Sequence, residues 1–228
     1  MRDVGAIVLA AGASKRLGQP KQLLTIDGEA LVRRIVNAAS AAGCARIAVV
    51  VGATRDRIAA ELRGTAAEIV DNDEWQRGLG TSIRRGVEYL VSAQPDLEAV
   101  MLLVCDQPFV DRAIIHALID ERDRSGKPIV ASSYDAASPN IVMSTEVETS
   151  LKEISGRDSS TSVGMTKEGG VPALFDRVCF EALLRLPDDS GAKPLIEADL
   201  TRVAWIAFPE GAIDIDTPAD LARLPTLR

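Results

Sequence analysis

Five short apolar runs alternate with helical segments over the first 132 residues, and this alternation limits the possible folds more than any other feature. The runs lie at Val4–Ala10, Arg46–Gly52, Ala67–Asn72, Glu98–Asp106 and Pro128–Ser132. Apolar residues at helical spacing predict helices at residues 31–39, 55–62, 81–92 and 113–124. Continuous rather than alternating apolar runs are typical of a parallel sheet that helices cover on both faces. We therefore predict an α/β protein with three α/β/α layers, a Rossmann-like arrangement and a mostly parallel central sheet.

The later part of the chain is less regular. Periodicity is weak from Ser133 to Gly170, where Ser, Thr, Asp, Glu and Gly dominate, and this stretch is either a long excursion or a partly mobile lid. Beyond it, the spacing predicts helices at 178–186 and 195–200, a strand at 202–208 and a helix that Thr217 caps. We find no repeat and no clean linker, so we expect a single domain over residues 1–228.

Charge and composition exclude several classes of protein. The net charge is −7 and aromatic residues make up 4% of the chain, which argues against a general nucleic-acid binder or an anionic-membrane binder. No apolar run approaches the roughly 18 residues of a membrane span. The cysteines are Cys44, Cys105 and Cys179, and no two of them form a Cys-x-x-Cys pair. The N-terminal apolar stretch is short, and cations follow it, whereas in a signal peptide they precede it. We therefore expect reduced thiols and a cytoplasmic location.

The loop after the first apolar run carries the groups that a phosphate site needs. Gly12, Ala13 and Ser14 can bring backbone amides close to a phosphate, and Arg16 and Lys21 can neutralise its charge. The spacing is neither the Walker pattern nor G-x-G-x-x-G. On the residue types alone, a phosphate-binding loop is favoured over an ordinary solvated loop.

The same loop belongs to a longer motif. The stretch LAAGASKRLGQPKQLL, residues 9–24, resembles the signature L-A-A-G-x-S-x-R-x-G-x-x-K of the MobA-like nucleotidyltransferases, and is most similar to that of the molybdenum cofactor cytidylyltransferases. The resemblance implies a nucleotidyltransferase fold in which this loop wraps a nucleoside triphosphate. It also implies that Arg16 and Lys21 contact the phosphates, whereas Lys15 falls at a variable position. The implied nucleotide-binding residues of the loop are Leu9, Ala10, Ala11, Gly12, Ala13 and Ser14.

Two acidic segments point to a metal ion. Asp106 ends the most hydrophobic run, and Mg²⁺ prefers carboxylate oxygens as protein ligands; the alternative role is a cap on the following helix. The surrounding CDQP resembles the metal-binding segment of the family's cytidylyl branch. DIDTPADL resembles the family segment D-x-D-T-P-E-D-L, which implies Asp216 as a second Mg²⁺ ligand with Asp214 beside it. A helix N-cap is the other role open to Asp216.

The segment NDEWQRGLGTSIRRG, residues 72–86, resembles a family segment that contacts the base and the ribose. Taken alone, its Gly-Leu-Gly triplet could simply be a turn into a helix. Trp75 and Trp205 are predicted to be core or pocket-wall residues rather than a platform for stacked bases. The implied nucleotide contacts are Asn72, Gly78, Gly80 and Ser82.

Two further segments border the implied acceptor site and depart from the family pattern. GGVPALF, residues 169–175, resembles a G-H-P segment but has Val171 in place of histidine. DDSGAK, residues 188–193, resembles G-D-x-G-A-R, with Asp188 for the first glycine and lysine for the arginine. Lysine keeps the charge but loses the bidentate phosphate geometry of arginine. The resemblance is close at both ends of the chain and poor in the middle. The predicted acceptor-side residues are Pro172, Lys193 and Asp214.

Nucleotidyl transfer to a phosphate fits this set of residues. A phosphate monoester is already ionised, so in-line attack on the α-phosphorus needs positioning and charge neutralisation rather than a strong base. His116, the only histidine, is expected at a surface or interface. The resemblance implies Mg²⁺, CTP and molybdopterin, with hand-over to a molybdoenzyme partner as a family-level expectation.

Residues 1–132 would then form the nucleotide-binding half, and residues 133–228 the acceptor-binding half with an irregular excursion at 138–168. The alternatives are transfer to a sugar or polyol phosphate, and a non-catalytic nucleotide-binding protein on the same fold.

Overall fold

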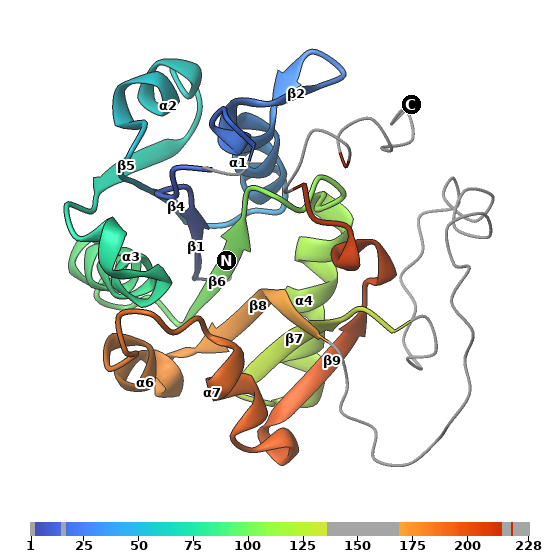
Figure 1. The fold of residues 1–228 in the computed structure, drawn as a ribbon. Helices are drawn as coiled ribbons and strands as arrows, with labels where there is room; N and C mark the ends of the chain where they lie inside the picture. The colour runs from blue at the N-terminus through green and yellow to red at the C-terminus, as the bar shows by residue number, and fades with distance from the viewer. Residues whose placement is uncertain (1–2, 15–16, 136–168, 216–219, 221–228) are drawn as a thin grey trace.

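A seven-stranded mixed sheet forms the centre of the protein (Figure 1). The computed structural model describes residues 3–14, 17–135, 169–215 and 220. The strand order is β5-β4-β1-β6-β8-β7-β9, and among these strands only β8 runs antiparallel to its neighbours. The mostly parallel sheet confirms the predicted α/β class. The strands are β1 (Val4–Leu9), β4 (Arg46–Val51), β5 (Ala67–Asp71), β6 (Ala99–Val104), β7 (Ile129–Ser133), β8 (Gly169–Asp176) and β9 (Val203–Ala207).

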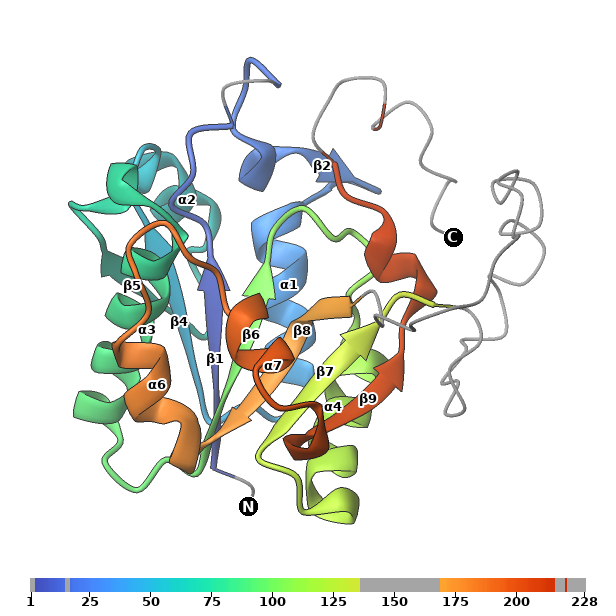
Figure 2. The ribbon, with the colours of Figure 1, turned by 60° about the horizontal axis from the view of Figure 1, so that its bottom comes forward.

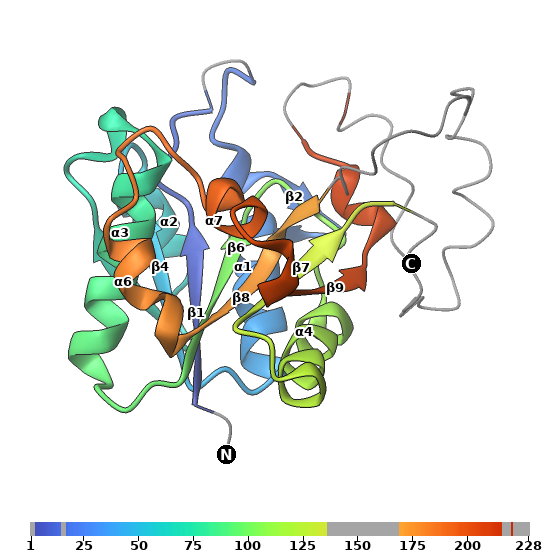
Figure 3. The ribbon, with the colours of Figure 1, turned by 90° about the horizontal axis from the view of Figure 1, so that it is seen from below.

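Helices cover both faces of this sheet, which gives the three predicted layers (Figures 2 and 3). One face carries α1 (Leu31–Ala41), α2 (Arg55–Glu61) and α4 (Arg112–Ser125). The other face carries α3 (Leu79–Ala93), α6 (Phe180–Leu184) and α7 (Lys193–Glu197). Between β1 and α1 the chain makes a 3₁₀ turn at Lys21–Leu23 and a short hairpin of β2 (Thr25–Ile26) and β3 (Glu29–Ala30).

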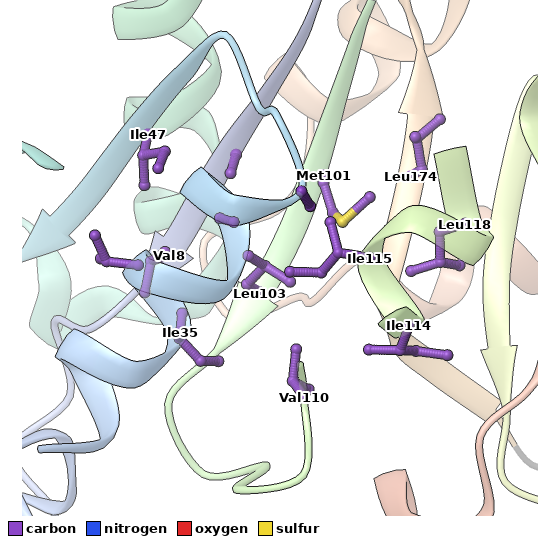
Figure 4. Packing of buried hydrophobic residues seen from close by; sticks show 14 of the residues in the cluster. Val8, Ile35, Ile47, Met101, Leu103, Val110, Ile114, Ile115, Leu118 and Leu174 are labelled. Carbon is purple, nitrogen blue, oxygen red and sulfur yellow. The ribbon is translucent and has the colours of Figure 1, made fainter. Parts of the chain in front are cut away.

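Successive residues of a strand pack into opposite hydrophobic layers. In β6, Met101 and Leu103 belong to the layer of α1 and α4, whereas Val100 and Leu102 belong to the layer of α3 and α6. Figure 4 shows Met101 and Leu103 next to Ile115 of α4. These four side chains of β6 are fully buried, and the burial of each stabilises the fold by about 1.5–3 kcal/mol. The strands therefore form a fixed base for the loops at their carboxyl ends.

The helix that follows β6 is capped by Asp111 and not by Asp106. The Asp111 carboxylate accepts a hydrogen bond of 3.0 Å from the backbone N–H of Ile114, and such a cap contributes about 1 kcal/mol. Gly126, with φ of 62°, ends the helix in the left-handed conformation. The capping role considered for Asp106 is therefore wrong for α4, and its carboxylate instead accepts a hydrogen bond from Lys21.

Strand β8 was not predicted from the sequence. Residues 169–175 contain two glycines and Pro172, which oppose a strand locally because proline removes a donor from a central strand. The structure places this segment between β6 and β7. The register shifts between Ala131 and Ser132 of the neighbouring β7, and the Ser132 hydroxyl donates a hydrogen bond of 2.7 Å to the Pro172 carbonyl. This irregularity accommodates the proline, as bulges commonly do.

The helices after β8 are shorter than predicted. The segment predicted as one helix at 178–186 is a 3₁₀ turn, Arg177–Cys179, followed by α6. The segment predicted at 195–200 is α7, followed by a 3₁₀ turn at Leu200–Arg202. The excursion at 138–168 and the cap at Thr217 lie outside the described residues. All three cysteines are free thiols, as expected. Within the described ranges, no helix has the length and hydrophobicity to cross a membrane.

Candidate active site

A pocket of about 430 Å³ opens where β1 and β6 end side by side. The two strands are parallel neighbours, with Leu9 paired to Val104, so their carboxyl ends meet at one edge of the sheet. After β1 the chain fills the sheet on one side with β4 and β5, then returns to add β6 on the other side. Ligands of open α/β sheets bind at such a switch point. The pocket is lined by Leu9, Ala11, Gly12, Lys21, Gln22, Trp75, Gln76, Gly78, Leu79, Ser82, Val104, Cys105 and Asp106.

The ion pair between Lys21 and Asp106 lies at this pocket. The Lys21 ammonium donates a hydrogen bond to the Asp106 carboxylate, although the two residues are 85 positions apart. Lys21 starts the 3₁₀ turn after the N-terminal loop, and Asp106 follows the end of β6. Their side chains are only 23% and 20% exposed, so solvent screens the pair incompletely. The fold thus joins the residue predicted for phosphate with the residue predicted for metal.

The buried side chain of Gln22 holds the N-terminal loop through hydrogen bonds, a role that was not predicted from the sequence. Its amide nitrogen donates hydrogen bonds to the carbonyls of Ala10 (3.0 Å) and Gly12 (2.8 Å). The backbone N–H of Lys21 donates to the Ser14 hydroxyl at 3.0 Å, which closes the loop on itself. The sequence carries no local signal for this role, because a polar glutamine next to Lys21 looks like a solvated residue.

The opposite wall of the pocket is the beginning of α3. Asn72 is 6% exposed, and its amide nitrogen donates to the hydroxyls of Thr81 and Ser82, both at 2.9 Å. The Asn72 oxygen accepts from the backbone N–H of Glu74 at 3.0 Å. Asn72 therefore orients Ser82, which lines the pocket, and does not line it itself. Trp75 lines the pocket as a wall, as predicted.

A close contact joins α3 to the segment before α7. The Gly80 N–H donates to the Asp188 carbonyl at 2.8 Å, and the Asp188 carboxylate binds Arg77 and Arg84, both at 2.5 Å. A Cβ on Gly78 would lie 2.4 Å from the Asp188 carbonyl oxygen, so only glycine fits. The Arg84 hydrogen bond and the charge of Arg77 lower the pKa of Asp188. Gly78 and Gly80 thus have a structural reason to be glycine besides any nucleotide contact.

On the other side of Asp106, a buried hydrogen-bonded group connects three segments. The Gln107 amide nitrogen donates to the Tyr134 hydroxyl at 3.1 Å and to the Gly211 carbonyl at 2.8 Å, and the Tyr134 hydroxyl donates to the Val171 carbonyl at 2.5 Å. Burial raises the pKa of Tyr134 to about 12. The backbone N–H of Ile215 donates to the Asp106 carbonyl at 3.0 Å. The C-terminal segment that carries the predicted acidic pair therefore reaches the end of β6.

The predicted site residues fall into four groups. Seven line the pocket: Leu9, Ala11, Gly12, Lys21, Gly78, Ser82 and Asp106. Five described residues of the loop and of α3 lie next to it without lining it: Ala10, Ala13, Ser14, Asn72 and Gly80. The acceptor-side residues lie elsewhere: Pro172 is buried in β8, Lys193 begins α7 and pairs with Glu197 at 3.7 Å, and Asp214 is exposed. Arg16 and Asp216 are outside the described residues.

The donor set at the pocket suits a hard divalent cation. Asp106 supplies carboxylate oxygens at the pocket wall, and Mg²⁺ is commonly held by one or two carboxylates together with substrate phosphates and water. The neighbouring Cys105 is 2% exposed, and burial raises the pKa of its thiol well above the usual range, so the thiol is protonated at neutral pH. Among the described residues, no group of three His, Cys, Asp or Glu side chains lies close enough together to hold a metal ion.

Comparison with known proteins agrees with this geometry. Residues 6–203 match the family model described as the MobA-like NTP transferase domain. The chain therefore belongs to the MobA-like NTP transferase domain family, a family of nucleotidyltransferases.

Two curated relatives match nearly the whole chain. Bifunctional protein GlmU of Sphingopyxis alaskensis is 29% identical over 230 residues, which cover 97% of this chain and 49% of the relative. Bifunctional IPC transferase and DIPP synthase of Rubrobacter xylanophilus is 31% identical over 243 residues, which cover 96% of this chain and 50% of the relative. The chain thus spans about half the length of these curated relatives.

Solved structures show the same fold. A nucleotidyl transferase from Methanothermobacter thermautotroptrophicus has a TM-score of 0.70 at 20% identity, covering 96% of this chain and 94% of that chain. Rv0371C of Mycobacterium tuberculosis H37Rv in complex with manganese has a TM-score of 0.64 at 23% identity, covering 97% of each chain. At these identities the likeness shows the nucleotidyltransferase-like α/β fold alone.

Proposed function

We propose that the protein transfers a nucleotidyl group from a nucleoside triphosphate to a phosphorylated acceptor and releases pyrophosphate. The observation that carries this proposal is the Lys21–Asp106 pair at the switch-point pocket. Because Lys21 is a phosphate-binding cation and Asp106 a metal-binding carboxylate in the motifs that the chain carries, their meeting at one pocket matches the needs of phosphoryl-type transfer. Membership of the nucleotidyltransferase family supports the same activity.

The roles follow from charge and position. Lys21 would stabilise the negative charge that develops at the α-phosphate, and Arg16 would hold the pyrophosphate leaving group. The acceptor phosphate attacks in line, and no general base is required because it is already ionised. His116 lies on α4, outside the pocket lining, which agrees with a reaction that does not use it. Residues 1–132 would bind the nucleotide and residues 133–228 the acceptor.

Asp106 and Asp216 would hold Mg²⁺ as the cofactor. When bound, the ion would neutralise charge on the triphosphate. The bonding of Ile215, the residue before Asp216, to the Asp106 carbonyl supports the pairing of these two acids. The structurally similar Rv0371C forms a complex with manganese, which supports a divalent cation for this protein as well. Lys21 is bonded to one oxygen of the Asp106 carboxylate, Oδ2, so the ion would share this carboxylate with the Lys21 ammonium.

The finer assignment is CTP as the nucleotide and molybdopterin as the acceptor, in the cytoplasm, with a molybdoenzyme receiving the product. Its support is the LAAG form of the loop, in which Ala11 lines the pocket at 6% exposure, and the Gln107 that follows Asp106. Pro172, Lys193 and Asp214 would serve the acceptor side.

A second candidate is transfer to a sugar or polyol phosphate. The observation that favours it is the departure of Val171 and Lys193 from the family pattern, since Lys193 is exposed and paired with Glu197. A non-catalytic nucleotide-binding protein is the third alternative, and membership of a nucleotidyltransferase family argues against it.

The test is Mg²⁺-dependent pyrophosphate release from CTP, GTP, ATP and UTP, each with and without molybdopterin. We expect release from CTP only when molybdopterin is present. Release with another nucleotide would overturn the CTP assignment and keep the transferase. Release with a sugar or polyol phosphate in a screen of acceptors would favour the second candidate.

The variant that separates an enzyme from a binding protein is Asp106→Ala. It should abolish pyrophosphate release while nucleotide binding is largely kept. The matched control is Asp96→Ala, because Asp96 is exposed and lies before β6, at the opposite end of that strand. No release by the wild-type protein with any acceptor, together with tight triphosphate binding, would support the binding-protein alternative.

A further inference from the structure

The side chain of Gln22 is almost completely buried beneath the N-terminal loop, at 1% exposure. Its amide nitrogen donates to two carbonyls of the loop, Ala10 at 3.0 Å and Gly12 at 2.8 Å. Its oxygen Oε1 is buried and has no hydrogen-bond partner among the described residues. A buried, unpartnered amide oxygen costs free energy. The two bonds from the nitrogen must therefore contribute enough to keep this residue in place.

These two bonds fix the direction of two peptide groups. In a planar trans peptide the carbonyl of one residue and the N–H of the next point to opposite sides. When the Ala10 and Gly12 carbonyls face Gln22, the N–H groups of Ala11 and Ala13 must face away from it. Neither N–H donates a hydrogen bond to an acceptor in the described part of the chain. Two amide donors, two residues apart, are thus presented on one side of the loop.

The rest of the loop is braced in the same orientation. The Ala11 carbonyl accepts a hydrogen bond of 3.2 Å from the N–H of Ala53, and the N–H of Ala10 donates to the Val50 carbonyl at 2.9 Å. The carbonyls of Ala10, Ala11 and Gly12 are therefore all bound by the protein itself. Ala11 and Gly12 also line the pocket. Carbonyl oxygens would repel a nucleotide's oxygen atoms, whereas free amide groups attract them.

We propose that Gln22 is a positioning residue for the nucleotide: it keeps the Ala10 and Gly12 carbonyls turned inward, so that the Ala11 and Ala13 amides are donors for oxygen atoms of a bound nucleoside triphosphate. Gln22 is among the residues around the pocket, but its side chain is 1% exposed and its free oxygen is buried, so its proposed role is to hold the loop rather than to bind the nucleotide. The inference rests on the proposed function for the identity of the ligand. The conformation of the loop does not depend on that function.

The experiment compares Gln22→Met, Gln22→Glu and the control Gln94→Met. Methionine keeps the volume and removes both donors. Glutamate keeps the shape and the Oε1 acceptor, but replaces the donor with a second oxygen that faces two carbonyls. Gln94 also donates through its amide nitrogen, to Asp3 at 3.2 Å, but ends α3 at the other end of the molecule.

The first readout is hydrogen exchange of the nucleotide-free protein at Ala10, Lys21 and Ala53, whose N–H groups close the loop. We expect faster exchange in both Gln22 variants and no change in Gln94→Met. The second is the Kd of each of the four nucleoside triphosphates with Mg²⁺, by calorimetry. Loss of the two bonds should raise the Kd roughly tenfold to a hundredfold, with glutamate at least as damaging as methionine. Thermal unfolding checks that each variant is folded. If Gln22→Met does not fold, Gln22→Asn replaces it, because the shorter asparagine side chain does not reach the Ala10 and Gly12 carbonyls.

The outcomes separate the alternatives. Unchanged exchange and unchanged Kd in Gln22→Met would overturn the inference. A Kd kept by glutamate and lost by methionine would overturn it as well, because the ligand would then contact Oε1 directly. Wild-type protein that binds none of the four triphosphates would contradict the proposed function and the ligand named here, while the exchange data would still decide whether Gln22 shapes the loop.

Discussion

The contact between α3 and the segment before α7 gives a sharp test of how the pocket wall is built. In a Gly80→Ala variant, the new Cβ would lie 1.9 Å from the Pro187 carbonyl oxygen. Ordinary contacts between carbon and oxygen are about 3.3 Å, so the Pro187 carbonyl would have to retreat by roughly 1.4 Å. Backbone, unlike the end of a flexible side chain, cannot rotate out of the way. The Gly80 hydrogen bond to the Asp188 carbonyl, 2.8 Å long, would break.

The expected loss of stability follows from these terms. Overpacking costs about 1–3 kcal/mol, and loss of the hydrogen bond costs about 0.5–1.5 kcal/mol. Alanine recovers at most about 1 kcal/mol of helix propensity at a position near the helix start. The free energy of unfolding should therefore fall by about 2 kcal/mol. Because Gly78 and Leu79 line the pocket, binding of a nucleoside triphosphate should also weaken.

The assay is urea unfolding followed by circular dichroism, with the triphosphate Kd measured on the same samples. The matched control is Gly191→Ala, in the same contact, where a Cβ would lie 3.3 Å from the end of the flexible Leu79 side chain. It should change stability by less than about 0.5 kcal/mol. Equal stability of the two variants would refute the reasoning, because the backbone contact would then not be rigid.

Three further predictions test single interactions. Lys21→Met should lower kcat about 10²–10³-fold, as steady-state kinetics would measure. The free energy of unfolding, measured in urea, should change by less than about 1 kcal/mol, because Asp106 stays partly solvated without its partner. Asp188→Asn should have a lower free energy of unfolding than wild type at pH 7, and this difference should shrink as the pH falls below about 4, because the carboxylate of Asp188 is protonated only below its lowered pKa. A difference that stays constant with pH would contradict the role of the Asp188 charge. Tyr134→Phe should cost about 1–2 kcal/mol at pH 8 because the Val171 carbonyl loses its donor; equal unfolding midpoints would show that water replaces the hydroxyl.

Much of the architecture could be read from local pattern. The run Glu98–Asp106 is continuously apolar because helices cover both sides of β6, and this continuous pattern indicated a mostly parallel sheet covered on both faces. The motif around Lys21 and the position of Asp106 at a strand end predicted a phosphate contact and a metal ligand separately, and only the structure shows that the two side chains form an ion pair. Strand β8 was missed because Pro172 and two glycines oppose strand formation locally, and only the irregular pairing with β7 overcomes this.

The sequence by itself determined the class of fold and the residue types of the candidate site, because hydrophobic periodicity and short motifs are properties of neighbouring residues. The tertiary structure decided which residues hold those groups in place. Gln22 supports the loop only because it is buried beneath it, and Asp188 fixes Gly80 only because a segment over 100 positions away packs against α3. Such roles depend on burial and on contacts between distant segments, which packing sets and local sequence does not encode.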